Sequence, residues 1–163
     1  MEIILASTTT YRQALLRRLQ VDFRCEAPEV EEVRLPQEAP AAMAERLAVA
    51  KATAVASRYP GALVIGSDQV ATLDGELLGK PGDHDRARVQ LLKSSGRQVD
   101  FYTGLAVLCP ARDFSGVHVE PFRVHFRELD PVEIDAYLHR EAPYDCAGSF
   151  KCEGLGIALF ARL

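Results

Sequence analysis

Short apolar runs alternate with longer amphipathic stretches along this sequence, and the alternation limits the folds that the chain can adopt. Apolar runs at residues 2–6, 21–25 and 62–67 are typical of strands. Residues 8–20 and 41–59 instead repeat apolar side chains at intervals of three and four, which predicts helices. Strands separated by helices in this way favour an α/β fold, in which helices flank a sheet.

The first helix has recognisable start signals and an apolar face. Ser7 and Thr8 offer side-chain oxygens that can cap its amino end. Tyr11, Leu15 and Leu19 are spaced at helical intervals, so we expect them to pack against the sheet.

The second half of the chain adds further strands and two more helices. In order, the sequence predicts strands at 70–73 and 76–78, a helix from Asp83 to about residue 94, a long hairpin of 98–108 and 117–127, a helix beginning at Asp130-Pro131, and a strand at 155–163. The Asp74-Gly75 dipeptide suits a type I′ turn between the two short strands. We therefore expect a mixed, twisted sheet flanked by helices, and not a sandwich or a bundle.

Length and charge limit the kinds of partner. A chain of 163 residues suits a single domain at 1–163. The formal net charge of -4 gives no basic surface for a nucleic acid polymer, although a local group of cations can still bind a small phosphorylated ligand. No apolar run is long enough for a signal peptide or a membrane span, which predicts a cytoplasmic protein without a membrane partner.

Polar residues near predicted helix starts and strand ends could bind phosphate. Ser7, together with the N–H groups of a helix start, can hold phosphate oxygens, and Arg12 can add a guanidinium. Lys51 and Lys80 can oppose further negative charge. The alternative is that Ser7 is only a helix cap and that the three cations are solvated surface side chains.

An acid closely follows one of the apolar runs of the sequence. Asp68, in "IGSDQV", comes just after the apolar residues 62–65, where a buried carboxylate needs a partner, water or a cation. With Glu32 from the acidic loop, Asp68 could bind Mg²⁺, which requires few carboxylates. Alternatively, Asp68 bonds to its own backbone in a turn, and the acidic loop is merely solvated.

Several motifs together resemble a known family. The segments "ILASTTTYRQALL", "APEVEE", "IGSDQV", "GKP", "FYTGLAV" and "AGSFKCEGLGIALF", with Lys51, resemble in order the Maf family of nucleoside triphosphate pyrophosphatases. The likeness runs from residue 3 to the end of the sequence. It implies a two-lobed α/β fold with a central cleft, shared with inosine triphosphatase-like enzymes, and hydrolysis that releases pyrophosphate with the help of Mg²⁺ or Mn²⁺.

The resemblance also implies roles for individual residues. It makes Asp68 the catalytic acid, which acts as base toward water and contacts the metal with Glu32. Lys51 and Lys80 match catalytic basic positions, and Ser7 and Arg12 match positions that hold the substrate phosphates.

Three further residues match positions that separate subgroups of the family. Gln69 and Glu153 are similar to the subgroup that hydrolyses 7-methyl-GTP, and Tyr11 stands where that subgroup is expected to have Trp. A methylated guanine is positively charged, so the Tyr11 ring could attract it. Glu153 could accept hydrogen bonds from guanine N1–H and the 2-amino group.

The sequence departs from the family pattern near both ends. The opening "TTTYRQ" has one basic position fewer, and Glu31 replaces an Asp. The family's turn and helix after the final strand are missing, so we expect an exposed sheet face and a possible homodimer. A dTTP and UTP pyrophosphatase of the same family, and a nucleotide-binding regulator without hydrolytic activity, remain as alternatives.

Overall fold

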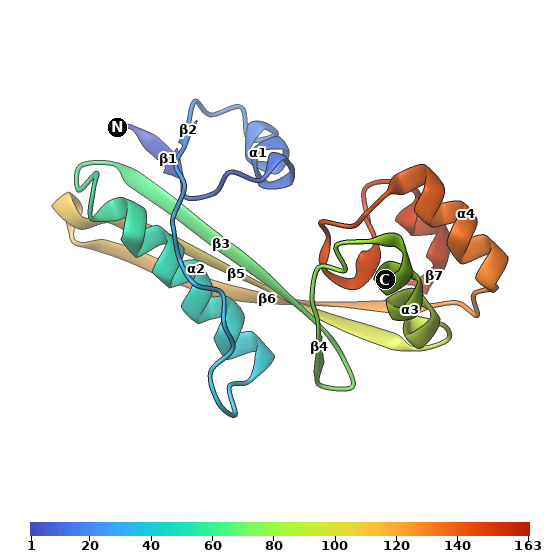
Figure 1. Cartoon of the computed structure of the whole chain (residues 1–163). Helices are drawn as coiled ribbons and strands as arrows, with labels where there is room; N and C mark the ends of the chain where they lie inside the picture. The colour runs from blue at the N-terminus through green and yellow to red at the C-terminus, as the bar shows by residue number, and fades with distance from the viewer. The chain divides into compact units, whose positions relative to one another are not determined.

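The fold consists of seven strands and four α-helices, as the α/β prediction required. A computed structural model describes residues 1–163 (Figure 1). In chain order the elements are β1 (Ile3–Leu5), α1 (Thr10–Arg17), β2 (Arg24–Cys25), α2 (Pro40–Ala56), β3 (Leu63–Leu73), β4 (Glu76–Leu78), α3 (His84–Ser94), β5 (Gln98–Cys109), β6 (Phe114–Phe126), α4 (Pro131–Glu141) and β7 (Phe160–Arg162). Short 3-10 helices cover Pro110–Arg112, Ala147–Ser149 and Leu155–Leu159. None of the helices has the length and apolar character needed to cross a membrane.

One mixed sheet joins the strands in the order β2-β1-β3-β5-β6-β7, and β4 pairs with β3 outside this path. The pairs β1–β2 and β1–β3 are parallel, whereas β3–β4 and β6–β7 are antiparallel. The mixed sheet predicted from the sequence is therefore confirmed. The chain also divides into two compact units, with residues 1–68 and 103–120 in the first and residues 69–102 and 121–163 in the second.

The first unit is built around the close approach of α2 to two strands. Gly66 of β3 lies so near the helix that an added Cβ would stand 2.3 Å from the Ala48 carbonyl oxygen. Gly104 of β5 is in the same situation, because its Cβ would stand 2.2 Å from the Ala44 carbonyl oxygen. Both distances are far below van der Waals contact, so only glycine allows the two backbones to approach this closely.

Small residues on α2 complete this contact. Ala48 and Ala52 are fully buried, and with Val55 they form a core with strand residues of the first unit. The same buried face contains Lys51, whose side chain is directed into the unit although it carries a charge. Of the apolar positions that repeat at helical intervals in this stretch, Met43 and Leu47 are buried, whereas Ala50 and Ala54 are only half-buried.

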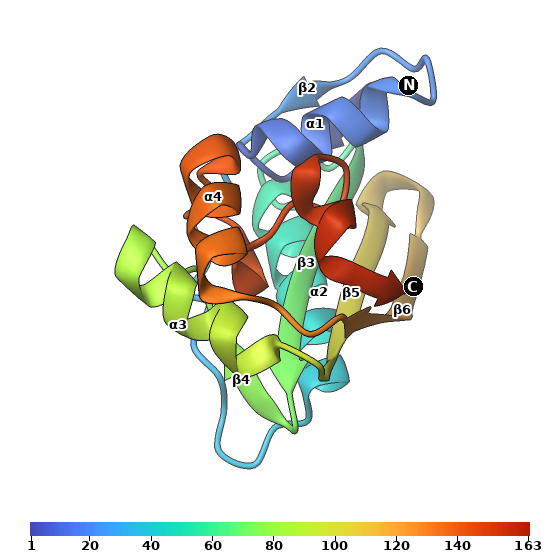
Figure 2. The ribbon, with the colours of Figure 1, turned by 90° about the vertical axis from the view of Figure 1, so that its right-hand side faces the viewer.

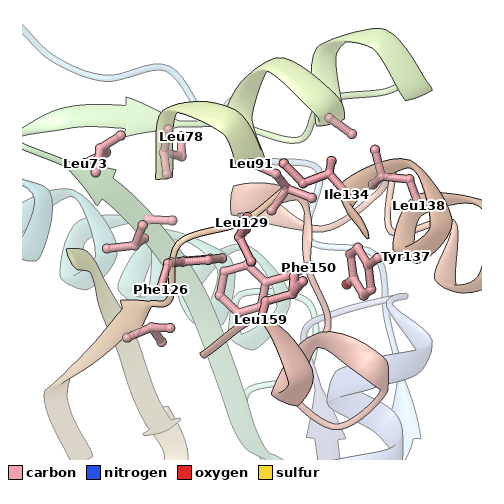
Figure 3. Packing of buried hydrophobic residues seen from close by; sticks show 14 of the residues in the cluster. Leu73, Leu78, Leu91, Phe126, Leu129, Ile134, Tyr137, Leu138, Phe150 and Leu159 are labelled. Carbon is pink, nitrogen blue, oxygen red and sulfur yellow. The ribbon is translucent and has the colours of Figure 1, made fainter. Parts of the chain in front are cut away.

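The second unit has its own apolar core between α3, α4 and the strands. Helices α3 and α4 lie side by side (Figure 2). Leu91, Ile134 and Leu138 from these helices are fully buried. Phe126 and Phe150 meet edge to face beside Leu159, as Figure 3 shows. Aromatic rings in such arrangements contribute about 0.5–1.5 kcal/mol beyond their buried area.

Both predicted helix starts in this unit are confirmed. The side chain of Asp83 caps α3 by accepting a hydrogen bond from the Arg86 backbone N–H at 2.9 Å. Asp130 and Glu133 form a complete capping box at the start of α4, with Pro131 at its first turn. The expected hairpin turn is also present, because Asp74 and Gly75 both have positive φ angles, of 51° and 83°.

Several predicted elements are wrong in their extent, and the strand expected at 21–25 is confined to Arg24–Cys25. The strand expected to end before Asp68 instead continues to Leu73, because the alternation of buried and exposed side chains persists through residues 66–70. Helix α1 ends at Arg17, and Gln20 then takes a left-handed φ of 54° that breaks the helical path. As a result, Leu19 lies outside the helix.

The apolar face predicted for α1 is not buried. No residue of α1 is buried, and Tyr11 and Leu15 are 39% and 47% exposed. The helix has only eight residues, so its apolar side chains cover little more than two turns.

The final strand is likewise shorter than expected. Residues 155–159 form a 3-10 helix, because Gly156 lies directly over the Lys151 carbonyl, where a Cβ would be only 2.2 Å from the oxygen. The strand is confined to Phe160–Arg162.

Gly66→Ala tests the contact between α2 and β3. The added methyl group would overlap the Ala48 carbonyl, so we expect the free energy of unfolding to fall by about 1–3 kcal/mol. Urea unfolding followed by circular dichroism measures this change. Gly61→Ala is the matched control, since a Cβ added at Gly61 would meet no atom within 4 Å. Equal stability of the two variants would contradict the close approach.

Candidate functional site

Asp68 lies in the middle of β3, not in a turn at its end. It follows Val64 and Gly66 along the strand at intervals of two, and all three are buried on the face that α2 covers. Gln69, the next residue, is exposed. The strand therefore holds the Asp68 carboxylate in a fixed position against α2, and the turn considered as the alternative for Asp68 is absent.

Lys51 of α2 pairs with this carboxylate and with a second one. Its Nζ donates to Asp68 Oδ1 at 2.6 Å and lies 2.5 Å from Glu32 Oε1. The Lys51 and Asp68 side chains are only 6% and 9% exposed, whereas the Glu32 side chain is 52% exposed. Lys51 therefore bridges a buried acid and an exposed one. The structure places these three residues in direct contact.

Arg12 brings a second cation to the same acid. Its Nη2 lies 4.0 Å from Asp68 Oδ1, which is a longer contact than that of Lys51, and its side chain is 24% exposed. Arg12 is thus close enough to Asp68 to interact with its charge and open enough to contact a ligand. Tyr11, beside it on α1, is exposed.

Ser7 is buried next to β1 but does not cap α1. The helix starts two residues later than predicted, with Thr9 as its N-cap, and Thr9 makes no side-chain capping bond. Ser7 Oγ instead accepts a hydrogen bond from the Thr9 N–H at 3.2 Å and lies 3.1 Å from Thr9 Oγ1. Leu5 pairs in parallel with Ile65, so Ser7 follows β1 at the same edge where β3 continues to Asp68.

The loop that carries Glu32 is fastened to α2 by a charged network. Arg46 donates from Nε to Glu38 Oε1 at 2.6 Å and from Nη2 to Glu38 Oε2 at 2.9 Å. The same guanidinium donates to the Val33 carbonyl at 2.9 Å. This pair holds the backbone next to Glu32, and the sequence analysis missed it. The only sequence signal was an acid and a base eight residues apart, which fits no capping or helix-pair pattern.

Glu38 is strongly acidic for physical reasons that are visible in the structure. Hydrogen bonds from Arg46 lower its pKa to about 2, against the opposing effect of burial, and the Leu35 N–H contributes in the same direction. Its side chain is only 8% exposed.

The remaining predicted residues belong to the second unit. Lys80 lies between β4 and α3, where it lines a pocket of about 390 Å³ with Pro81 and with Gln90 of α3. Glu153 is exposed on the segment that follows the 3-10 helix Ala147–Ser149. Gln69 is the first residue of this unit. The first unit thus contains Ser7, Tyr11, Arg12, Glu32, Lys51 and Asp68, and the second contains Gln69, Lys80 and Glu153.

Two carboxylates of the first unit have the chemistry that a hard divalent cation prefers. Glu32 and Asp68 offer oxygen ligands, and both already share one cation, the Lys51 ammonium. No group of three His, Cys, Asp or Glu side chains is placed to hold a metal ion. Mg²⁺ nevertheless needs only one or two carboxylates, since water and substrate phosphates complete its shell. The pair therefore fits Mg²⁺ and would not fit a closed structural metal site.

Comparisons with known proteins show the family to which the chain is related. The family model described as Maf-like protein matches residues 2–163. A protein of Pseudomonas syringae pv. tomato (strain ATCC BAA-871 / DC3000) named 7-methyl-GTP pyrophosphatase is 53% identical over 158 residues, which cover 97% of this chain and 82% of that protein.

Solved structures show a similar fold at much lower identity. The Staphylococcus aureus Ham1 protein matches with a TM-score of 0.56 at 19% identity, over 77% of this chain and 72% of that chain. A HAM1 protein from Coxiella burnetii matches with a TM-score of 0.51 at 16% identity, over 77% and 73%. At these identities, the two structures support the fold alone.

Arg46→Gln tests how the loop carrying Glu32 is held. The Glu38 pKa is below its ordinary value of 4.5, so this interaction stabilises the fold above that pH and is lost as the pH falls toward about 2. We expect the substitution to raise the Glu38 pKa toward 4.5, as measured by carboxyl ¹³C NMR titration. Arg58→Gln, which removes an arginine bonded to the Ala27 carbonyl, should leave it unchanged. A wild-type Glu38 that titrates near 4.5 would contradict the network.

Proposed function

Because this chain belongs to the Maf family, we propose that it is a nucleoside triphosphate pyrophosphatase and that its substrate is 7-methyl-GTP. The reaction consumes water and the triphosphate and yields 7-methyl-GMP and pyrophosphate. The identity to a named 7-methyl-GTP pyrophosphatase, over nearly the whole chain, supports the choice of nucleotide.

The observation that carries the proposal is the buried charge cluster at Asp68. Lys51 and Asp68 are both nearly inaccessible, and each loses its hydration on folding. Apolar side chains of similar volume would often be as stable in such a position. A catalytic role therefore explains a buried acid with two cations nearby better than a contribution to the stability of the fold does.

We assign the roles within the first unit as follows. Asp68 acts as the base that accepts a proton from the attacking water. Arg12, which is partly exposed, contacts the phosphate oxygens, where a guanidinium can bind two oxygens at once. Ser7 contributes its hydroxyl beside them. Lys51 orients the Asp68 carboxylate through its hydrogen bond, in addition to opposing phosphate charge.

The charge balance supports a divalent metal as the cofactor. Arg12 and Lys51 bring two positive charges to Glu32 and Asp68, which bring two negative ones. The cluster therefore offers no net positive charge to a triphosphate. Mg²⁺ or Mn²⁺, held by Glu32 and Asp68, would supply that charge and neutralise the phosphate oxygens.

Residues of the second unit complete the proposal. Lys80, exposed beside its pocket, supplies a further positive charge to the phosphates. Glu153 reads the guanine edge, because a carboxylate can accept from N1–H and from the 2-amino group. Gln69 offers an amide to the same nucleotide. In the first unit, Tyr11 presents its ring to the positively charged methylated base.

Pyrophosphate release tests the proposed function directly. With Mg²⁺ or Mn²⁺ present, we expect the purified chain to release pyrophosphate from 7-methyl-GTP in preference to GTP, UTP, dTTP and CTP. Asp68→Asn should lower kcat at least about 10²-fold, because it removes the base but keeps the shape. The exposed Asp22→Asn is the control and should match wild type.

Three outcomes would change the proposal. Activity on UTP or dTTP alone would replace the substrate but keep the mechanism. Wild-type turnover by Asp68→Asn would reject the role of that acid. A folded wild-type chain that binds nucleotides but hydrolyses none of the five would favour a non-hydrolytic regulator.

Glu153→Gln tests the choice of base. Glutamine keeps the size of the side chain but replaces one accepting oxygen with a donor, which faces the donors of guanine. We expect the kcat/KM ratio of 7-methyl-GTP over UTP to fall at least about tenfold, because hydrogen bonds to a charged group are strong. Glu76→Gln, another exposed acid of the second unit, serves as the control. An unchanged ratio in Glu153→Gln would remove Glu153 from substrate recognition.

A further inference from the structure

The Gln90 side chain of α3 joins two loops of the second unit. Its Nε2 donates a hydrogen bond to the Gly79 carbonyl at 3.1 Å. Its Oε1 accepts one from Ser149 Oγ at 2.6 Å. The orientation of the amide is fixed by chemistry, since a backbone carbonyl can only accept and therefore must face the NH₂ group.

Each of these loops carries a residue of the proposed site. Gly79 directly precedes Lys80, and Gln90, Lys80 and Pro81 line the same pocket. Ser149 begins the segment that leads to Glu153. One amide side chain thus contacts the backbone beside the phosphate-binding lysine and the start of the segment that carries the base-reading acid.

Ser149 is an unusual residue for a purely structural role. It is fully buried, and its backbone φ is 65°, a left-handed conformation that non-glycine residues rarely adopt. A buried hydroxyl without a hydrogen bond would be costly, so its bond to Gln90 is needed where it stands. A glycine could adopt this φ angle without burying a hydroxyl that needs a hydrogen-bond partner. The Ser149 hydroxyl therefore serves to connect the segment to Gln90.

The segment that carries Glu153 is also held at two later points, both by α4. The Tyr137 hydroxyl accepts a hydrogen bond from the Lys151 N–H at 3.1 Å. The Glu141 carboxylate accepts one from the Leu155 N–H at 2.7 Å. Glu153 therefore lies between fixed points, and Gln90 is the partner that connects this segment to the loop of Lys80.

We propose that Gln90 is a positioning residue that sets Lys80 and Glu153 together through its bonds to Gly79 and Ser149. This inference rests on the proposed function, because it assigns Gln90 to the placement of two proposed substrate-binding residues. A displacement of about 1 Å at such groups can lower the rate by about 10²-fold. Loss of the Gln90 amide can therefore weaken both phosphate binding by Lys80 and base recognition by Glu153.

Three substitutions separate the two bonds. Gln90→Met keeps the approximate length of the side chain and removes both bonds. Gln90→Glu can still accept from Ser149 but cannot donate to Gly79. Ser149→Ala removes the other bond and leaves Gly79 paired. Gln98→Met is the matched control, because the Gln98 amide bonds to Asp100 on its own strand.

The expected results differ between the variants. Gln90→Met should lower kcat/KM for 7-methyl-GTP at least about tenfold and also reduce the preference over UTP. Gln90→Glu should lower turnover of both nucleotides alike, because it disturbs the Lys80 side. Ser149→Ala should mainly reduce the preference, because it disturbs the Glu153 side. Melting temperatures should fall by no more than about 8 °C, since only one or two hydrogen bonds are lost.

Hydrogen–deuterium exchange provides a test that does not need turnover. We expect Gln90→Met, but not Gln98→Met, to speed amide exchange at both residues 79–82 and residues 149–155. Unchanged exchange in both segments would overturn the inference, whether or not the protein is active.

Kinetics distinguish failure of the inference from failure of the proposed function. If wild type is active, and Lys80→Ala and Glu153→Gln each impair it, then wild-type kinetics in Gln90→Met overturn the inference alone. If wild type hydrolyses none of the nucleotides, the proposed function fails, and the exchange measurement still decides whether Gln90 couples the two loops.

Discussion

The packing of the first unit depends on how closely α2 approaches the sheet. Gly66 and Gly104 place no side chain of their own between the helix and the two strands, so the α2 backbone approaches both strands closely. This closeness lets Lys51, whose position on the helix would otherwise suit an apolar residue, reach Asp68 on the strand. Buried charges are tolerated only when they are paired, so the packing and the ion pair depend on one another.

The sequence correctly predicted those caps and turns that are formed by interactions between residues close together in the chain. The capping box at Asp130, the cap at Asp83 and the turn at Asp74-Gly75 all depend on atoms a few residues apart. The errors arose where distant contacts decide. Asp68 looks like the end of a strand, yet pairing with Lys51 allows the strand to continue through it. At residues 155–159, the contact of Gly156 with the Lys151 carbonyl overrides a strand-like composition.

The candidate site shows the same division. Family motifs in the sequence identified Asp68, Lys51, Glu32 and Arg12, and the structure joins them by contacts of 4.0 Å or less. No sequence pattern indicated that Lys51 would bind both acids, because this requires α2, β3 and the preceding loop to converge. The residues that hold the loops, Arg46 and Gln90, have no motif at all. Each donates a hydrogen bond to a backbone carbonyl, which any sequence can provide, and each also bonds to one side chain, Glu38 for Arg46 and Ser149 for Gln90.

The division into two units has a consequence for how the protein is made. Each unit combines two separate stretches of chain, so neither corresponds to a continuous segment that could be expressed alone. Strand β1 must wait for β3, which starts only at Leu63, and the first unit lacks part of its sheet until residue 120 has been synthesised. Early in translation, apolar residues of β1 and α2 therefore have no complete core to join. Folding is dominated by long-range pairing, which is slow and leaves the nascent chain open to aggregation.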